Sequence, residues 1–155
     1  MTREDKQLLL ITLCGMLPYG VVLNVPTIDG SENKKLVSIV NEDDGVPCAA
    51  VYSTEEKKSD GSLISYAKTI YAICDVLPYL RPMSSMTSEE KNTFEFFVTC
   101  NTSDTLDSIS WANIQNLSIV RDSCDFIDWL NEHHFDYRGL IPMGLALEAP
   151  EGMYK

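Results

Sequence analysis

The fold of this chain is decided by residues 20–52, which read GVVLNVPTIDGSENKKLVSIVNEDDGVPCAAVY. Apolar runs rich in β-branched residues occupy residues 20–25, 35–40 and 46–52, and polar segments containing Gly, Asp and Asn separate them. Such segments are typical of turns, and short turns join strands that run antiparallel. We therefore predict three successive strands in an antiparallel meander.

A helix is predicted before this meander. Residues 3–16 carry apolar side chains at helical spacing, and Glu4 and Asp5 stand in what would be the first turn. Thr2 is a residue type that often caps helix N-termini, while Gly15 and Pro18 mark the end.

Two further helices are predicted after the meander. Thr87 and Glu90 form the T-x-x-E capping-box pattern and begin a helix over residues 87–98. Residues 121–134 predict another helix, whose apolar face holds Cys124, Ile127, Leu130 and His134.

The remaining segments complete an α+β fold. Residues 54–62 are polar and predict a surface loop, whereas Pro78 and Pro82 bracket a piece that must be extended or a tight turn. The apolar tail, residues 139–147, is expected to pack on the body. We predict a single domain over residues 1–155, with an N-terminal helix, a short antiparallel sheet of three to five strands and two further helices packed on it.

The chain is strongly acidic. It has 12 basic and 23 acidic residues, a formal net charge of −11. Residues 81–155 hold 5 basic and 12 acidic residues, so the excess is greater in this half. Acidity favours solubility. It also suits binding to a basic partner, in which case the acidic surface would imitate nucleic acid. Direct binding of nucleic acid is disfavoured, because an acidic surface repels phosphate.

The cysteine content indicates a reducing compartment. The chain has five cysteines without metal-type spacing, and we expect buried, reduced thiols in a cytoplasmic protein. Residues 8–14 are apolar but lack the flanks of a signal peptide, and no run approaches the roughly 20 apolar residues of a membrane span.

The two histidines, His133 and His134, do not predict a metal site. Adjacent positions on a helix point about 100° apart, whereas helical metal pairs are spaced by three or four residues. We interpret both as cations at the negative C-terminal end of the helix dipole.

Acidic side chains of the 121–134 helix form the candidate partner surface. These acidic residues recur at steps of three and four, which indicates a solvent-exposed face of the helix. The alternative interpretation is that two of the carboxylates pair for acid–base chemistry. Arg81 and Arg138 are read as structural ion-pair or carbonyl-capping residues, with ligand contact as the alternative. The candidate surface comprises Asp122, Asp125, Asp128, Glu132 and Arg138.

Catalytic and cofactor motifs are absent from the sequence. No G-x-S-x-G, P-loop or G-x-G-x-x-G pattern occurs, and nothing selects a pair from the cysteines and histidines. We therefore assign no catalytic, cofactor-binding or metal-ligating residue and expect no cofactor.

Several stretches support a resemblance. Residues 13–21, 78–87, 133–141 and 144–154 resemble small uncharacterised proteins of phages, prophages and other mobile elements of gut anaerobic bacteria. The resemblance implies a setting, an accessory protein in a bacterial cytoplasm, and no activity or functional residues.

These observations lead to one principal hypothesis. We expect a non-enzymatic accessory protein of phage type that binds another protein, through an acidic surface. The first alternative is a nucleic-acid-associated module with a local basic patch formed by Lys34, Lys35, Lys57, Lys58 and Arg81. The second is an enzyme with an unrecognised site.

Overall fold

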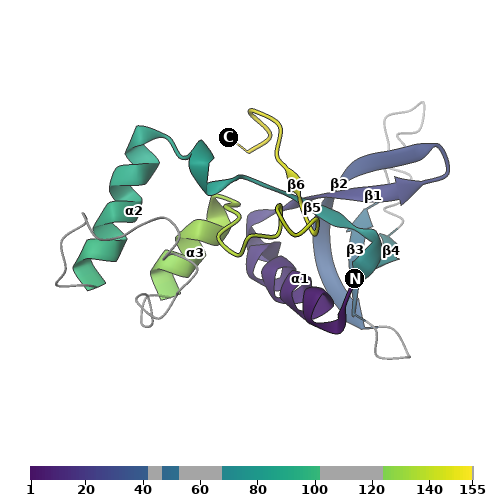
Figure 1. The fold of residues 1–155 in the computed structure, drawn as a ribbon. Helices are drawn as coiled ribbons and strands as arrows, with labels where there is room; N and C mark the ends of the chain where they lie inside the picture. Colours follow the sequence, from purple (N-terminus) through teal and green to yellow (C-terminus); the bar gives the residue numbers. More distant parts are fainter. Residues whose placement is uncertain (42–46, 53–67, 102–123, 155) are drawn as a thin grey trace, which may run out of the picture.

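The fold is α+β, as predicted, and a computed structural model describes residues 1–41, 47–52, 68–101 and 124–154 (Figure 1). The described helices are α1 (Arg3–Met16), α2 (Ser88–Asn101) and α3 (Cys124–Glu132), with 3-10 turns η1 (Leu17–Tyr19), η2 (Ile73–Asp75) and η3 (Met83–Ser85). The sheet contains β1 (Val22–Thr27), β2 (Gly30–Asn41), β3 (Pro47–Tyr52), β4 (Lys68–Ala72), β5 (Leu77–Leu80) and β6 (Leu147–Glu148).

Helix α1 has the bounds that the sequence predicts. Thr2 caps it through a reciprocal pair, in which the Asp5 N–H donates to Thr2 Oγ1 and the Thr2 N–H donates to Asp5 Oδ2. The chain turns away only at Gly20, whose φ of 76° suits glycine. Gly15 does not end the helix. A Cβ there would lie 3.0 Å from Asn131 Nδ2, so the glycine lets α3 approach closely.

The sheet is a meander that later segments extend. Strands β1 to β3 are successively antiparallel, which confirms the three predicted strands, and a loop of only two residues joins β1 to β2. The strand β4, which was not predicted, continues the meander antiparallel to β3. The strand β5 then returns to pair with β1, and β6 pairs parallel to β5. The order is therefore β4-β3-β2-β1-β5-β6, and the sheet is mixed, with six strands instead of three to five.

The later helices are joined to this core through α1. Helix α3 packs against α1 and η1, and it lies between α1 and α2 in Figure 1. Phe94 of α2 packs on Phe126 of α3, with ring centroids 5.2 Å apart. One cluster of buried apolar side chains thus runs from the sheet through α1 to α3, with Leu9, Leu23, Phe126, Leu130 and Phe135 among its members.

Helix α3 ends earlier than predicted. Its last helical residue is Glu132, whereas we predicted residue 134, and residues 121–123 lie outside the described part of the chain. The Phe135 N–H donates to the Leu130 carbonyl and the His134 N–H to the Asn131 carbonyl. These two bonds form a Schellman motif, with His134 in the left-handed position at φ 57°. The position is one where glycine is the usual residue.

The expectation of buried thiols holds for only one of the cysteines whose exposure is described. Cys48 is buried, but Cys14 and Cys74 are free and exposed. Cys74 is exposed because the 3-10 turn η2 directs the side chain of Ile73 into the core and that of Cys74 outward.

Candidate functional site

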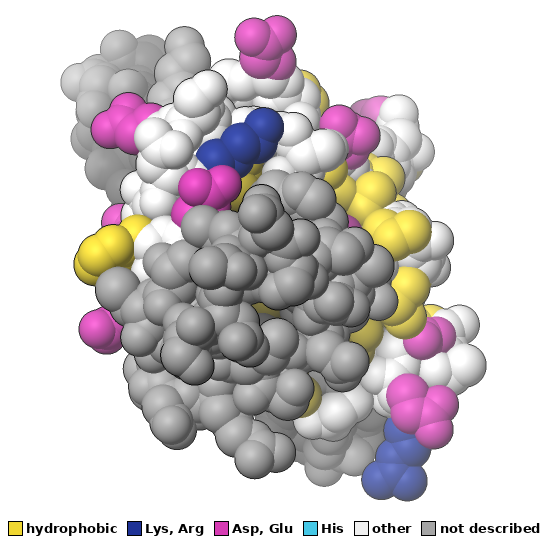
Figure 2. Space-filling model, turned by 60° about the vertical axis from the view of Figure 1, so that its left-hand side comes forward, with side chains coloured by type: hydrophobic (Ala, Val, Ile, Leu, Met, Phe, Trp, Pro, Cys, Tyr) yellow, Lys and Arg dark blue, Asp and Glu magenta, His cyan; other side chains and the backbone are white. Residues whose placement is uncertain are grey.

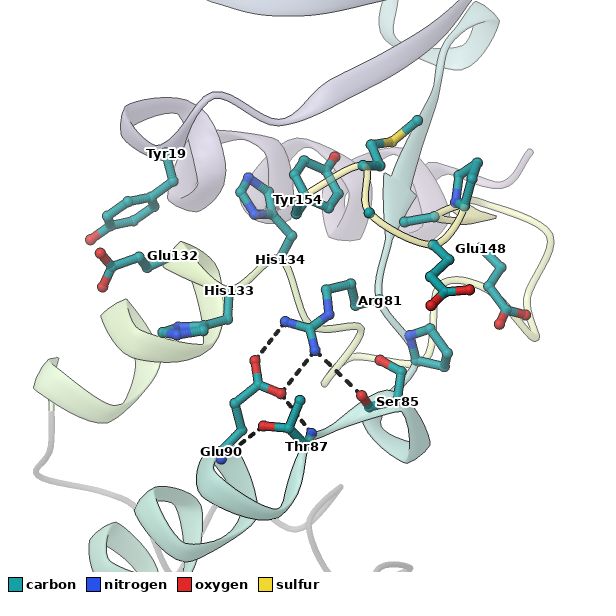
Figure 3. Close-up of a pocket in the computed structure, with 16 residues that line it drawn as sticks. Tyr19, Arg81, Ser85, Thr87, Glu90, Glu132, His133, His134, Glu148 and Tyr154 are labelled. Carbon is teal, nitrogen blue, oxygen red and sulfur yellow. Dashed lines mark hydrogen bonds and ion pairs between the residues drawn. The ribbon is translucent and has the colours of Figure 1, made fainter.

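A recess of about 970 Å³ lies where the end of α3, the C-terminal tail and the start of α2 meet (Figure 3). Main-chain hydrogen bonds next to β5 hold together the segments that line the recess. The Arg81 N–H donates to the His134 carbonyl, the Asp136 N–H donates to the Arg81 carbonyl, and the Ala149 N–H donates to the Leu80 carbonyl. The residues that follow α3 and those that follow β6 are therefore both fastened to the end of β5.

An ion pair forms one side of the recess. The guanidinium of Arg81 binds Glu90 through two bonds, of 2.7 and 2.9 Å, and lies 4.4 Å from the centre of the Phe135 ring. Glu90 also accepts the Thr87 N–H, which completes the predicted capping box. The hydrogen bonds from Arg81 lower the pKa of Glu90 to about 2. Arg81 is therefore an ion-pair residue, as predicted.

A stacked pair of rings forms the opposite wall. The rings of His134 and Tyr154 are nearly parallel, with centroids 3.7 Å apart. The Tyr154 hydroxyl donates to the Tyr79 carbonyl and accepts the Val22 N–H, so it ties the tail to β5 and β1. Burial raises the pKa of Tyr154 to about 12. The stack fixes the tail where it borders the recess.

His134 is buried without a hydrogen-bond partner. The residue is 5% exposed, and neither ring nitrogen has a partner at hydrogen-bond geometry, although the Tyr19 main chain lies near enough to influence its pKa. Burial lowers the pKa of His134 to about 4, against the opposing influence of the Tyr19 main chain, and the charges of His133, Arg81 and Lys35 lower it further. Our interpretation of His134 as a cation at the helix end is therefore wrong, because the stack with the tail removes its ring from water.

His133 occupies the helix end differently. Its Nδ1 lies 2.9 Å from the Trp129 carbonyl, and since a carbonyl only accepts, this nitrogen donates. The ring also packs against Trp129, with centroids 4.6 Å apart. The Trp129 carbonyl also accepts the His133 main-chain N–H, so the imidazole supplies a second donor to a carbonyl near the end of α3.

Carboxylates surround the opening of the recess. Glu132 at the end of α3 and Glu148 and Glu151 of the tail line it, and all three are exposed. Within the described ranges, none of them is paired with a lysine or arginine. Beside them, burial and the charges of Asp128 and Glu132 raise the pKa of Tyr19. We call Glu132, Glu148 and Glu151 the acidic rim.

The structure places the predicted partner surface only in part at this recess. Asp125, Asp128 and Glu132 are exposed on α3, and Asp122 lies outside the described residues. Arg138 does not join them as a free cation. Its guanidinium lies 5.1 Å from the centre of the Tyr137 ring, and its buried Nε has no partner.

The predicted basic patch can be followed only at Lys34, Lys35 and Arg81. Lys34 pairs with Glu32 at 2.7 Å, Arg81 is held by Glu90, and Lys57 and Lys58 lie outside the described residues. On the face in Figure 2, the dark-blue basic side chains that show lie next to magenta acidic ones. Two of the three described members of the patch are therefore engaged in ion pairs.

Sequence reasoning missed the tail as part of the site. Glu148, Glu151 and Tyr154 follow the apolar run 139–147, and they enter the sequence-based expectations only through the resemblance. A signal was present, because the final residues 148–154 combine carboxylates with an aromatic ring. Their convergence on the end of α3 depends on the pairing of β6 with β5.

Comparisons with known proteins add no assignment. No protein-family model, curated protein or solved structure matches the chain. Over the described residues, no helix is long and apolar enough to cross a membrane, and no three His, Cys, Asp or Glu side chains are grouped to hold a metal ion.

Proposed function

We propose that this chain is a non-enzymatic accessory protein of a phage or prophage, and that it binds a basic partner protein through its acidic surface. The observation that carries the proposal is a set of exposed carboxylates that have no basic partner among the described residues. They lie on α3 and on the tail, at Asp125, Asp128, Glu132, Glu148 and Glu151.

The arrangement of these charges supports binding more than simple solubility. Asp128 and Glu132 are one helical turn apart on α3, and both act on the same tyrosine, Tyr19. Like charges held this close repel one another, and a basic partner would relieve that repulsion. Tyr19 adds an aromatic surface of the kind enriched in protein interfaces.

A capture experiment with charge-matched variants tests the proposal. The wild-type chain, an α3 variant (Asp125→Asn, Asp128→Asn, Glu132→Gln) and a control (Glu4→Gln, Asp29→Asn, Asp75→Asn) are immobilised and exposed to lysate of a host bacterium. The control removes three exposed carboxylates elsewhere, so both variants have the same net charge. Captured proteins are identified by mass spectrometry, purified and titrated against each variant.

The expected partner is a basic protein that binds the wild type and the control and binds the α3 variant about tenfold more weakly. Its affinity should fall between 0.05 and 0.5 M salt, because exposed charges are screened. Capture that is independent of salt, or equal loss in the α3 variant and the control, would contradict the proposal.

A further inference from the structure

The recess has a surplus of negative charge. Its lining contains the acidic rim together with Glu90, and the only described lysine or arginine in that lining is Arg81. Arg81 and Glu90 neutralise each other, so the three carboxylates of the rim remain. An anionic ligand would be repelled by them, and a cation would be attracted.

The hydrogen-bonding groups of the recess point to the same kind of ligand. The Arg81 terminal nitrogens are already used, by both oxygens of Glu90 and by the Ser85 carbonyl. The rim offers carboxylate oxygens, which only accept hydrogen bonds. A ligand that brings several N–H donors therefore complements the recess better than one that brings acceptors.

His134 provides an independent observation. It lines the recess, is 5% exposed and has two ring nitrogens without a partner. An imidazole kept neutral by burial has one acceptor nitrogen, and leaving it unpaired in the interior is unfavourable. Few buried polar groups lack a partner, and one beside a recess indicates where a ligand would supply it.

The aromatic lining favours a flat cation. Tyr19, His133 and Tyr154 contribute rings to the recess (Figure 3). A guanidinium is planar, stacks on such rings and presents five N–H donors in a fixed fork that fits carboxylates. An ammonium has three donors and no plane.

We infer that the recess binds the guanidinium of an arginine side chain of the basic partner, with the acidic rim as its outer acceptors and His134 as its inner one. The inference rests on the proposed function and specifies what part of the partner is recognised. Because both His134 nitrogens are inaccessible in the structure, binding requires neighbouring side chains to shift, and the stacked ring of Tyr154 is one of these neighbours. The ring signals of His134 and Tyr154 should therefore change on binding.

Small peptides of defined charge test this assignment. The full chain is titrated by NMR with Ac-Gly-Gly-Arg-Gly-Gly-amide and with the same peptide carrying citrulline or lysine. Citrulline keeps the shape of arginine without its charge. The arginine peptide should shift the His134 and Tyr154 ring signals saturably, and the other two should bind about tenfold and about threefold more weakly.

Two variants locate the binding. The rim variant Glu148→Gln, Glu151→Gln should weaken the arginine peptide about fivefold to tenfold, whereas the control Glu4→Gln, Asp29→Asn should change its affinity by less than twofold. His134→Phe keeps a ring against Tyr154 and removes the acceptor, so it should also weaken binding.

Several outcomes would overturn the inference: equal binding of arginine and citrulline, lysine binding as tightly as arginine, or equal effects of the rim variant and the control. Such a result leaves the proposed function standing if the α3 variant still loses a basic protein partner. Conversely, arginine binding at His134 without any salt-sensitive protein capture refutes the protein partner and identifies a site for small guanidinium compounds.

Discussion

Replacing His134 by phenylalanine should remove a pH dependence from the stability of the fold. The pKa of His134 is lowered from 6.5 to about 4, so the unfolded chain takes up a proton at a pH where the folded chain does not. The contribution to stability is therefore complete above pH 6.5 and is lost as the pH falls toward 4. By linkage, the loss is about 2 kcal/mol at pH 5 and about 3 kcal/mol below pH 4.

The test compares urea denaturation of the wild type and His134→Phe at pH 7.5 and pH 5, followed by tryptophan fluorescence. Phenylalanine can stack on Tyr154 as the imidazole does, and any cost of the φ of 57° is independent of pH. Between the two pH values, the variant should gain about 2 kcal/mol relative to the wild type. The groups facing His134, which include His133, Arg81, Lys35 and Tyr154, are the same in both proteins.

A control variant checks that the pH-dependent difference in stability is caused by His134. Thr2→Ala removes a helix cap far along the chain and should lower stability by about 1 kcal/mol at both pH values. If the wild type and His134→Phe lose stability in parallel between pH 7.5 and 5, His134 is not buried in the neutral form and the reasoning fails.

Three further substitutions test the contacts around the recess by urea denaturation. Tyr154→Phe leaves the Val22 N–H and the Tyr79 carbonyl without their partner and should lower stability by about 1–3 kcal/mol, so an unchanged midpoint would refute the tie between tail and sheet. Glu90→Gln should cost about 1–2 kcal/mol at pH 7. This stability deficit should narrow below pH 4.5, because the pKa of Glu90 is lowered to about 2 and the stabilisation by ionised Glu90 in the wild type is lost as the pH falls through that value. A deficit that widens below pH 4.5 would contradict the assignment. Asp136→Asn removes a carboxylate that accepts the Leu140 and Ile141 N–H groups at 2.7 and 2.9 Å and should cost about 1–3 kcal/mol, whereas exposed Asp125→Asn should stay within about 0.5 kcal/mol.

Local structure was predictable because its causes lie within a few residues. The caps at Thr2 and Thr87 each use a side chain three positions away, and both form as the sequence indicates. The meander was predictable for the same reason, since polar turns between β-branched runs leave few other arrangements. The extended piece at Pro78 follows from the restrictions that proline imposes on its neighbours.

The candidate site was predictable only in part, because its members are distant in the sequence. The acidic face of α3 follows from helical spacing, and Asp125, Asp128 and Glu132 are exposed there. The neutral state of His134 cannot be predicted from the residues next to it in the sequence. Burial by a ring 20 positions later makes it neutral, and no local rule distinguishes that outcome from a solvated cation.

The sequence by itself determined the acidic charge, the first helix, the meander and the capped start of the second helix, because these depend on composition and on contacts within a turn. Only the tertiary structure decided that β5 would return to β1, that β6 would add to β5 and that the recess would form between them and α3. The physical reason is that pairing of distant segments is selected by the burial of whole surfaces and by the satisfaction of main-chain hydrogen bonds. The rim of carboxylates and the unpartnered imidazole are consequences of that pairing.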